Sequence, residues 1–293
     1  MEVRSGRFAI LGDLQRTSCV EFWRESNPEE SRRLVAEIAA RGPDFVVGLG
    51  DLVFRGSSRR DWARFDALTA PLRDASIPVL PILGNHDYWA RRGPALRNVF
   101  ARFSRLATSR WYAETYGILR LVFLDSNERA LGAAAWREEA AWLESELSRA
   151  DEDEAAKGEG VFVHHPPYTN STVTGDELPV QRAFVPLFAA AKKTIAMISG
   201  HVHSYERFVR GGKTFLVAGG GGGPRVRLAS GAARRHADDV FDGPEVRPFH
   251  FLLCRPAASG LEVEVVGLEK GGDNFFSLAQ FALAWPSCAR SRI

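Results

Sequence analysis

The sequence contains little cysteine, and this scarcity excludes two kinds of architecture. Its three cysteines, Cys19, Cys254 and Cys288, are an odd number in a chain of 293 residues and lie in no CxxC spacing. A disulfide framework needs an even set of closely spaced cysteines, and a cysteine-type zinc site needs paired CxxC motifs. We therefore expect free thiols in a reducing compartment and a cytoplasmic location.

A marked excess of charge is also missing. The 38 basic residues are balanced by 36 acidic residues, which leaves a formal net charge of +2. A nucleic-acid-binding surface needs a local excess of lysine and arginine, whereas the arginines are dispersed along the sequence. We therefore expect no nucleic-acid partner.

Long apolar runs are absent as well. No stretch approaches the roughly 20 apolar residues of a membrane-spanning helix. A signal peptide requires an apolar region followed by a small-residue cleavage site. The segment from Met1 to Arg7 has no such pattern. The sequence therefore predicts neither a membrane partner nor a signal peptide.

Short apolar runs alternate with helical patterns along the chain, which indicates βαβ units and an α/β fold. Candidate strands are Phe8–Leu11, Phe45–Leu49, Pro78–Leu83, Trp111–Tyr116, Leu119–Leu124, Val161–Val163, Thr194–Ile198, Thr214–Ala218, Phe249–Cys254 and Leu261–Val266. Candidate helices run from Pro28 to Gly42 and over Asp61–Leu72, Ala95–Leu106 and Ala133–Leu147. The acidic stretch Asp151–Glu159 is interpreted as a solvated turn, and the residues after Gly272 carry no clear pattern.

Five polar motifs stand at the ends of candidate strands. They are Gly12-Asp13-Leu14-Gln15, Gly50-Asp51, Gly84-Asn85-His86-Asp87, His164-His165-Pro166 and Gly200-His201-Val202-His203. Ligands of open α/β sheets bind at the carboxyl ends of strands, so five such motifs on one edge would converge on one site. Taken singly, each residue could be a helix cap or a loop histidine, but their joint order and spacing favour a shared site.

The residue types in these motifs are those that a pair of divalent metals requires. Two metals about 3.5–4 Å apart clamp the attacking and leaving oxygens of an in-line displacement. A bridging carboxylate neutralises both ions, Asp, Asn and His fill the remaining positions, and alternate histidines of a His-x-His loop reach neighbouring ions. The motifs therefore predict a binuclear metal hydrolase.

The motif series resembles the calcineurin-like metallophosphoesterases, whose pattern is D-x-H, GD, GNH[DE], a lone His and GHxH in that order. The likeness runs from Asp13 to His203. The strings GHVHSYER, starting at Gly200, and HHPPY, starting at His164, are similar to the purple acid phosphatase branch in particular. The resemblance implies a single domain over residues 1–293, built as a four-layer α/β/β/α sandwich. Its two mixed β-sheets would carry a binuclear metal site at the C-terminal ends of their strands.

The resemblance also implies a role for each residue. The implied ligands are Asp13, Asp51 and His203 for the first metal, and Asp51, Asn85, His164 and His201 for the second, with Asp51 as the bridge. The two ions would be divalent, drawn from Mn, Fe, Zn or Mg. His86 would not bind metal but would face the substrate and protonate the leaving alkoxide.

Two positions depart from the family pattern, and both belong to the first metal. Gln15 stands where most of the family has histidine, so that its amide oxygen binds the metal or its side chain hydrogen-bonds a metal-bound water. Phe54 stands where purple acid phosphatases have a tyrosine ligand, and a phenyl ring cannot bind metal. The remaining ligands suit Mn²⁺, Mg²⁺ or Fe²⁺ better than Fe³⁺.

Substrate contacts are less clearly marked. The loop after Asn170-Ser171 lacks the histidine pair that plant purple acid phosphatases place there. Candidates are instead His165, Tyr168, Arg207 and the backbone near Gly219–Gly223. A run of five glycines can cradle phosphate, although a flexible loop at the rim of the site is the simpler interpretation.

The predicted reaction is hydrolysis of a small-molecule phosphate ester. The metals would lower the pKa of a bound water and give hydroxide, and His86 would donate a proton to the leaving oxygen. The purple-type string favours a phosphomonoesterase, whereas the chain size and expected location also suit a phosphodiesterase acting on a cyclic nucleotide or another diester. A non-catalytic metal-binding scaffold is a third alternative. The presence of seven motif residues argues against it, namely Asp13, Asp51, Asn85, His86, His164, His201 and His203.

Overall fold

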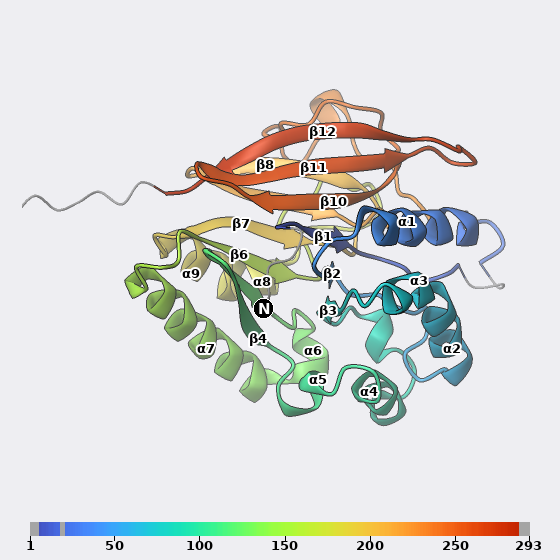
Figure 1. Ribbon diagram of the computed structural model, residues 1–293, viewed down its shortest axis with the longest axis horizontal. Helices are drawn as coiled ribbons and strands as arrows, with labels where there is room; N and C mark the ends of the chain where they lie inside the picture. The colour runs from blue at the N-terminus through green and yellow to red at the C-terminus, as the bar shows by residue number, and fades with distance from the viewer. Residues whose placement is uncertain (1–5, 18–20, 287–293) are drawn as a thin grey trace, which may run out of the picture.

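The structure, a computed structural model, describes residues 6–17 and 21–286. Two six-stranded sheets lie face to face, and helices cover part of their outer sides (Figure 1). The predicted α/β class with two mixed sheets is confirmed, and the bounds of most predicted strands agree with those observed.

The first sheet joins three parallel strands to an antiparallel meander. In spatial order its strands are β12 (Phe275–Ala284), β11 (Gly260–Leu268), β10 (Phe249–Pro256), β1 (Phe8–Leu11), β2 (Val46–Gly48) and β3 (Val79–Pro81). Because β1, β2 and β3 are parallel, their carboxyl ends share one edge. The sequence showed no pattern after Gly272, but Phe275–Ala284 form the edge strand β12. Most of its side chains are partly or fully exposed, so its apolar residues do not alternate.

The second sheet has four parallel strands flanked by two hairpin strands. In spatial order its strands are β4 (Tyr112–Tyr116), β5 (Leu119–Phe123), β6 (Gly158–Val163), β7 (Thr194–Ser199), β9 (Lys213–Ala218) and β8 (Tyr205–Arg210). β5, β6, β7 and β9 run parallel, whereas β4 and β8 pair antiparallel at the edges. The carboxyl ends of β6 and β7 therefore lie together at one edge of this sheet.

Helices fill the two outer layers and the connections. They are α1 (Pro28–Arg41), α2 (Arg59–Leu68), α3 (Ala70–Asp74), α4 (Arg92–Phe100), α5 (Arg105–Thr108), α6 (Glu128–Leu131), α7 (Ala133–Glu152), α8 (Leu178–Ala183) and α9 (Val185–Ala190), with short 3₁₀ turns η1 (His86–Tyr88) and η2 (Gly231–Ala233). The single helix predicted over Asp61–Leu72 is two helices in the structure. It breaks at Thr69, whose hydroxyl donates to the carbonyl of Phe65 at 2.8 Å.

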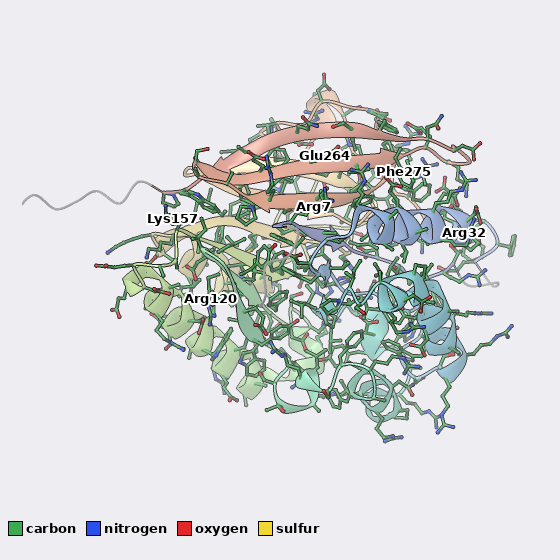
Figure 2. All side chains as sticks on the ribbon, viewed as in Figure 1. Arg7, Arg32, Arg120, Lys157, Glu264 and Phe275 are labelled. Carbon is green, nitrogen blue, oxygen red and sulfur yellow. The ribbon has the colours of Figure 1, made fainter. Side chains whose placement is uncertain are left out.

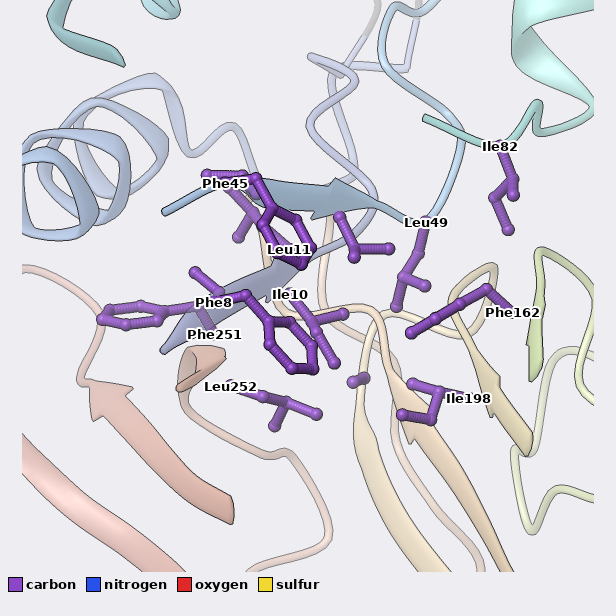
Figure 3. Packing of buried hydrophobic residues seen from close by; sticks show 14 of the residues in the cluster. Phe8, Ile10, Leu11, Phe45, Leu49, Ile82, Phe162, Ile198, Phe251 and Leu252 are labelled. Atoms are coloured by element: carbon purple, nitrogen blue, oxygen red, sulfur yellow. The ribbon is translucent and has the colours of Figure 1, made fainter. Parts of the chain in front are cut away.

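Side chains from both sheets form the central core. Ile10 and Leu252 of the first sheet lie near Phe162 and Ile198 of the second, and all four are almost fully buried (Figure 3). Full burial of each such side chain contributes roughly 1.5–3 kcal/mol. This packing holds the carboxyl edges of the two sheets in a fixed relation.

The structure corrects the interpretation of the acidic stretch before β6. Helix α7 continues to Glu152, and Glu159 is a buried residue of β6 rather than part of a solvated turn. Nearby, Arg120 points from β5 toward α7, where its Nε donates to Glu146 at 2.7 Å (Figure 2). Glu146 and Glu159 thus place two carboxyl groups in the layer between α7 and the second sheet.

Two features expected from composition can be compared with the structure. Cys254 is a buried free thiol whose pKa is raised by burial, whereas Cys19 and Cys288 lie outside the described residues. Within residues 6–17 and 21–286, no helix is both long and apolar enough to cross a membrane.

Candidate metal centre

The structure brings the five motifs together at the adjoining carboxyl edges of the two sheets. Asp13, Asp51 and Asn85 follow β1, β2 and β3, and His164 and His201 follow β6 and β7. The parallel pairing of these strands accounts for the convergence, because each strand delivers its following loop to the same edge.

One group of side chains surrounds Nε2 of His164. This atom lies 3.1 Å from Oδ1 of Asn85, 3.2 Å from Nδ1 of His201 and 3.4 Å from Oδ1 of Asp51. His165 is adjacent, with its ring centre 4.6 Å from that of His201. These side chains include all the residues that the resemblance assigns to the second metal.

A second group surrounds the other oxygen of Asp51. The Gln15 side-chain nitrogen donates to Oδ2 of Asp51 at 3.1 Å and lies 2.9 Å from Nε2 of His203. That same His203 atom is 3.6 Å from Oδ1 of Asp13. Asp51 therefore presents one carboxylate oxygen to each group, which is the arrangement that a bridging ligand needs.

Backbone carbonyls orient two of the imidazoles. Nδ1 of His164 is 2.8 Å from the carbonyl oxygen of Leu49, and Nδ1 of His203 is 2.8 Å from that of Pro224. A carbonyl can only accept, so each Nδ1 carries a proton and each Nε2 faces the cluster. A ring that is held in this way through its second nitrogen is the usual arrangement of a metal-binding histidine.

The backbone is strained at three of the ligand candidates. Asp13, Asp51 and His201 have φ values of 61°, 51° and 65°, in the left-handed region. Such a conformation costs roughly 1–3 kcal/mol for a residue other than glycine and concentrates at functional sites. This strain marks the three residues as positions where the site, rather than fold stability, sets the conformation.

The five glycines are not a flexible rim loop, which corrects the simpler interpretation of the sequence. All of Gly219–Gly223 are buried, and Gly219 and Gly223 adjoin the cluster. A Cβ atom at Gly219 would lie 2.7 Å from Oδ2 of Asp13, and one at Gly223 would lie 2.6 Å from the His203 ring. The run is therefore a packed wall that only residues without a side chain can form.

Burial and neighbouring charges set the protonation of the carboxylates. Burial raises the pKa of Asp13 well above its ordinary value, although the charge of His164 opposes this. Burial would also raise the pKa of Asp51, but the charges of His164 and His86 outweigh it and lower that pKa. Burial opposes a charge on His164, yet Asp51 raises the pKa of this ring to about 9. The ionised Asp51 thus favours a positive charge close to it, whereas burial favours the protonated form of Asp13.

The other imidazoles of the cluster are neutral. Burial lowers the pKa of His201 to about 3 and that of His203 to about 4. The cluster therefore combines Asp51, whose carboxylate favours a nearby cation, with the neutral imidazoles of His201 and His203. The ligand atoms of Asp13, Asp51 and His164 lie within 4.8 Å of one another. This donor set fits divalent metals that accept nitrogen and oxygen ligands.

His86 lies on the open side of the cluster, next to the exposed Asn85. Its Nδ1 is 2.7 Å from the carbonyl oxygen of Phe54, and its backbone N–H donates to Oδ1 of Asp51 at 2.8 Å. The Phe54 carbonyl, rather than a carboxylate, therefore holds the ring. Asp87 instead accepts backbone N–H groups, including that of Gly84 at 2.9 Å.

The three predicted substrate contacts are placed differently. His165 borders the second group and has its Nδ1 2.9 Å from the hydroxyl of Ser126. Tyr168 instead packs under the guanidinium of Arg210, at 3.7 Å from the ring centre. The Arg207 guanidinium lies 4.2 Å from the ring centre of Phe281, on β12. The structure therefore does not bring Tyr168 or Arg207 to the cluster.

Sequence reasoning did not single out Arg24, whose guanidinium forms an ion pair with Glu21 at 3.0 Å and whose charge acts on His203. Burial is the main cause of the lowered pKa of His203, and the positive charge of Arg24 contributes to it. The neighbouring Glu25 forms an ion pair with Arg225 at 2.8 Å, and Arg225 follows Pro224, the residue that accepts from His203. Arg24 belongs to no motif, so only the folded loop reveals its position.

Comparison with known proteins identifies the family. The calcineurin-like phosphoesterase family profile matches residues 6–205. The GAP50 anchor in the inner membrane complex of Plasmodium has a similar structure, with a TM-score of 0.71 and 16% identity over 96% of this chain and 89% of that chain. A dimetal phosphatase from Danio rerio gives a TM-score of 0.61 and 14% identity, over 95% and 98% respectively. These two likenesses show the fold, and the family profile covers most of the sequence. The chain therefore belongs to the calcineurin-like phosphoesterase family.

Proposed function

We propose that the protein hydrolyses phosphate esters with two divalent cations and that phosphomonoesters are its preferred substrates. The observation that carries this proposal is the division of Asp51, whose Oδ1 faces His164 and whose Oδ2 faces Gln15. A carboxylate shared in this way supports two cations rather than one.

Each cation would have its own set of ligands in addition to the shared Asp51. Asp13, His203 and Gln15 would hold the first, and Asn85, His164 and His201 would hold the second. When bound, the cations supply Lewis-acid chemistry and neutralise the negative charge of the phosphoryl group. The substrate would then bind on the open side of the cluster, beside Asn85 and His86.

The proposed proton donor to the leaving oxygen is His86. The Phe54 carbonyl accepts from its Nδ1, so Nε2 is the nitrogen that can carry a transferable proton. A positioned imidazole of this kind contributes typically 10²–10⁴-fold to a reaction that expels a poor leaving group. His165 lies beside the second ligand group, and we assign it to a nonbridging phosphate oxygen.

A pair of chromogenic esters tests the proposal. With Mn²⁺ present, p-nitrophenyl phosphate should be hydrolysed with a higher kcat/KM than bis-p-nitrophenyl phosphate, and Asp51→Asn should abolish both activities. A preference for the bis-ester would instead support a phosphodiesterase. Less than one equivalent of metal by elemental analysis, together with no activity on either ester, would support the non-catalytic scaffold.

A further inference from the structure

Two segments of the chain combine many arginines with no acidic residue. Residues 52–60 and 88–113 contain nine arginines and neither aspartate nor glutamate. The structure joins the segments through hydrogen bonds from the backbone N–H of Gly56 to the carbonyl of His86 (2.9 Å) and from that of Ser57 to Trp89 (3.3 Å). These contacts bring the two arginine-rich segments together beside the His86 turn, although the arginines look dispersed along the sequence.

A pocket of about 560 Å³ opens where the two segments meet. Its lining residues are Ser57, Arg59, Arg91, Pro94, Arg97 and Asn98. The three arginines are exposed, and none of them has an ion-pair partner among the described residues. Nearby arginines of the same segment do have partners, such as Arg102 with Asp66. The pocket thus concentrates positive charge that the protein itself leaves uncompensated.

We propose that this arginine pocket, lined by Arg59, Arg91 and Arg97, binds a second phosphate group carried on the leaving-group side of the substrate. Guanidinium groups donate paired hydrogen bonds that match the oxygens of a phosphate. The lining has no carboxylate that would repel the anion. The substrate class that follows is a small molecule bearing two phosphate groups.

The arginine pocket lies on the side of the metal centre that carries His86, and this position determines which part of the substrate the pocket would bind. This step depends on the proposed function, in which His86 protonates the leaving oxygen. The Trp89 ring lies edge-on to His86, with 4.9 Å between ring centres, and is exposed. Its carbonyl accepts from Ser57, which lines the pocket. Arg91 follows two residues later, at most about 7 Å from Trp89 between Cα atoms. The leaving group would therefore pass over Trp89 toward the arginines.

The pocket could also hold free inorganic phosphate, which has the same chemistry. The two sources differ in what they do to turnover. A second phosphate on the substrate adds binding energy only to substrates that carry it, whereas a free anion changes the hydrolysis of every substrate.

Matched alkyl esters test the subsite. Hexyl phosphate and 1,6-hexanediol bisphosphate have the same reacting group and differ in the distal phosphate, and the four- and eight-carbon diol bisphosphates vary the span. In the wild type, at least one bisphosphate should exceed hexyl phosphate in kcat/KM by about tenfold or more, through a lower KM. The double variant Arg59→Gln/Arg97→Gln should lose this preference and keep its activity on hexyl phosphate. The matched control, Arg60→Gln/Arg137→Gln, removes two exposed arginines outside the pocket and should keep the preference.

Several results would overturn the proposal. One is a wild-type kcat/KM for the bisphosphates that exceeds that for hexyl phosphate only by the factor expected because a symmetric bisphosphate has two equivalent reacting ends. Another is a preference that the double variant retains. If inorganic phosphate alters hexyl phosphate hydrolysis in the wild type but not in the double variant, and bisphosphates gain nothing, the pocket binds a free anion instead.

A binding measurement separates failure of the subsite from failure of the proposed function. Calorimetric titration of metal-free protein with the same bisphosphates needs no chemistry. Binding that is about tenfold weaker in the double variant than in the control supports the subsite even if no ester is hydrolysed. Equal binding by wild type and double variant, with hydrolysis intact, would refute the subsite and leave the proposed function standing.

Discussion

The side-chain nitrogen of Gln15 lies between Nε2 of His203 and Oδ2 of Asp51, at 2.9 and 3.1 Å. Both atoms are acceptors through which these residues would reach the first metal. Oε1 of Gln15 is buried and has no hydrogen-bond partner among the described residues. Rotating the amide by half a turn would exchange its nitrogen and oxygen. The oxygen would then lie between His203 and Asp51 and could bind a cation. Gln15 would thus have one side-chain orientation in the metal-free protein and the opposite one in the metal-bound protein.

The first prediction concerns metal affinity. Wild-type protein should bind one Mn²⁺ more tightly than the other, because an amide oxygen is a weaker ligand than an imidazole. Gln15→His should strengthen the weaker site about tenfold, in line with the 10–100-fold effects of changes near a metal. Calorimetric titration of metal-free protein measures both sites. The control variant Gln280→His, on β12, should leave the Mn²⁺ affinity of both sites unchanged. Two sites of equal affinity in the wild type would contradict this account.

The second prediction concerns colour. The Phe54 ring packs against His86 and Trp89, with ring centres 5.2 and 4.8 Å apart, and has no oxygen to offer a metal. Iron-loaded protein should therefore lack the intense visible absorption that a tyrosinate ligand gives to ferric iron. An absorption spectrum tests this directly. A strong visible band that disappears on reduction would show that another residue supplies such a ligand.

The third prediction concerns His86. His86→Ala should reduce kcat on an alkyl phosphate by about 10²–10⁴-fold, because the alkoxide needs a proton as it leaves. The loss on p-nitrophenyl phosphate should be much smaller, since p-nitrophenolate leaves without one. Metal content measured on the same samples should stay unchanged. Equal losses on the two esters would exclude the role of general acid.

The fourth prediction concerns the pH dependence of stability. Burial, together with the charges of Asp151 and Glu146, raises the pKa of Glu159 to about 8 from an ordinary 4.5. Neither carboxyl oxygen has a hydrogen-bond partner among the described residues. The folded state therefore holds a proton that the unfolded state releases. The contribution of this carboxyl to the free energy of unfolding is complete below pH 4.5 and is lost as the pH rises toward 8.

Glu159→Gln removes this loss, because its amide does not titrate. The wild type should lose about 1.4 kcal/mol of unfolding free energy per pH unit from this group within that window, and the variant should not. Urea denaturation at several pH values measures the difference. Glu144→Gln, an exposed control on α7, should follow the wild type. If the free energy of unfolding changes with pH in the same way in Glu159→Gln and in the wild type, Glu159 is ionised in the folded protein.

The convergence of the site could be predicted from the sequence, because motifs such as Gly84-Asn85-His86-Asp87 directly follow apolar runs. Parallel strands then bring their carboxyl ends to one edge. The packing around the motifs could not be predicted. The left-handed backbone of Asp13 and the tight contact of Gly223 with His203 depend on long-range packing that no local pattern records.

Features formed by distant segments were missed for the same reason. The loop of Arg24 is tied to residues about 200 positions later through the Glu25–Arg225 ion pair, so the charge of Arg24 acts on His203 only in the folded chain. The arginine pocket depends on the contact between Ser57 and Trp89. The edge strand β12 was missed because exposure on both faces removes the apolar alternation that identifies a strand.

The most direct test of the account is the release of phosphate from p-nitrophenyl phosphate by metal-stripped protein during titration with Mn²⁺. The account predicts no release without metal, and a rise that saturates only after a second equivalent is bound. The same titration of Asp51→Asn should remain flat, because the shared carboxylate is lost. Release that needs no metal, or that Asp51→Asn retains, would contradict a binuclear centre bridged by Asp51.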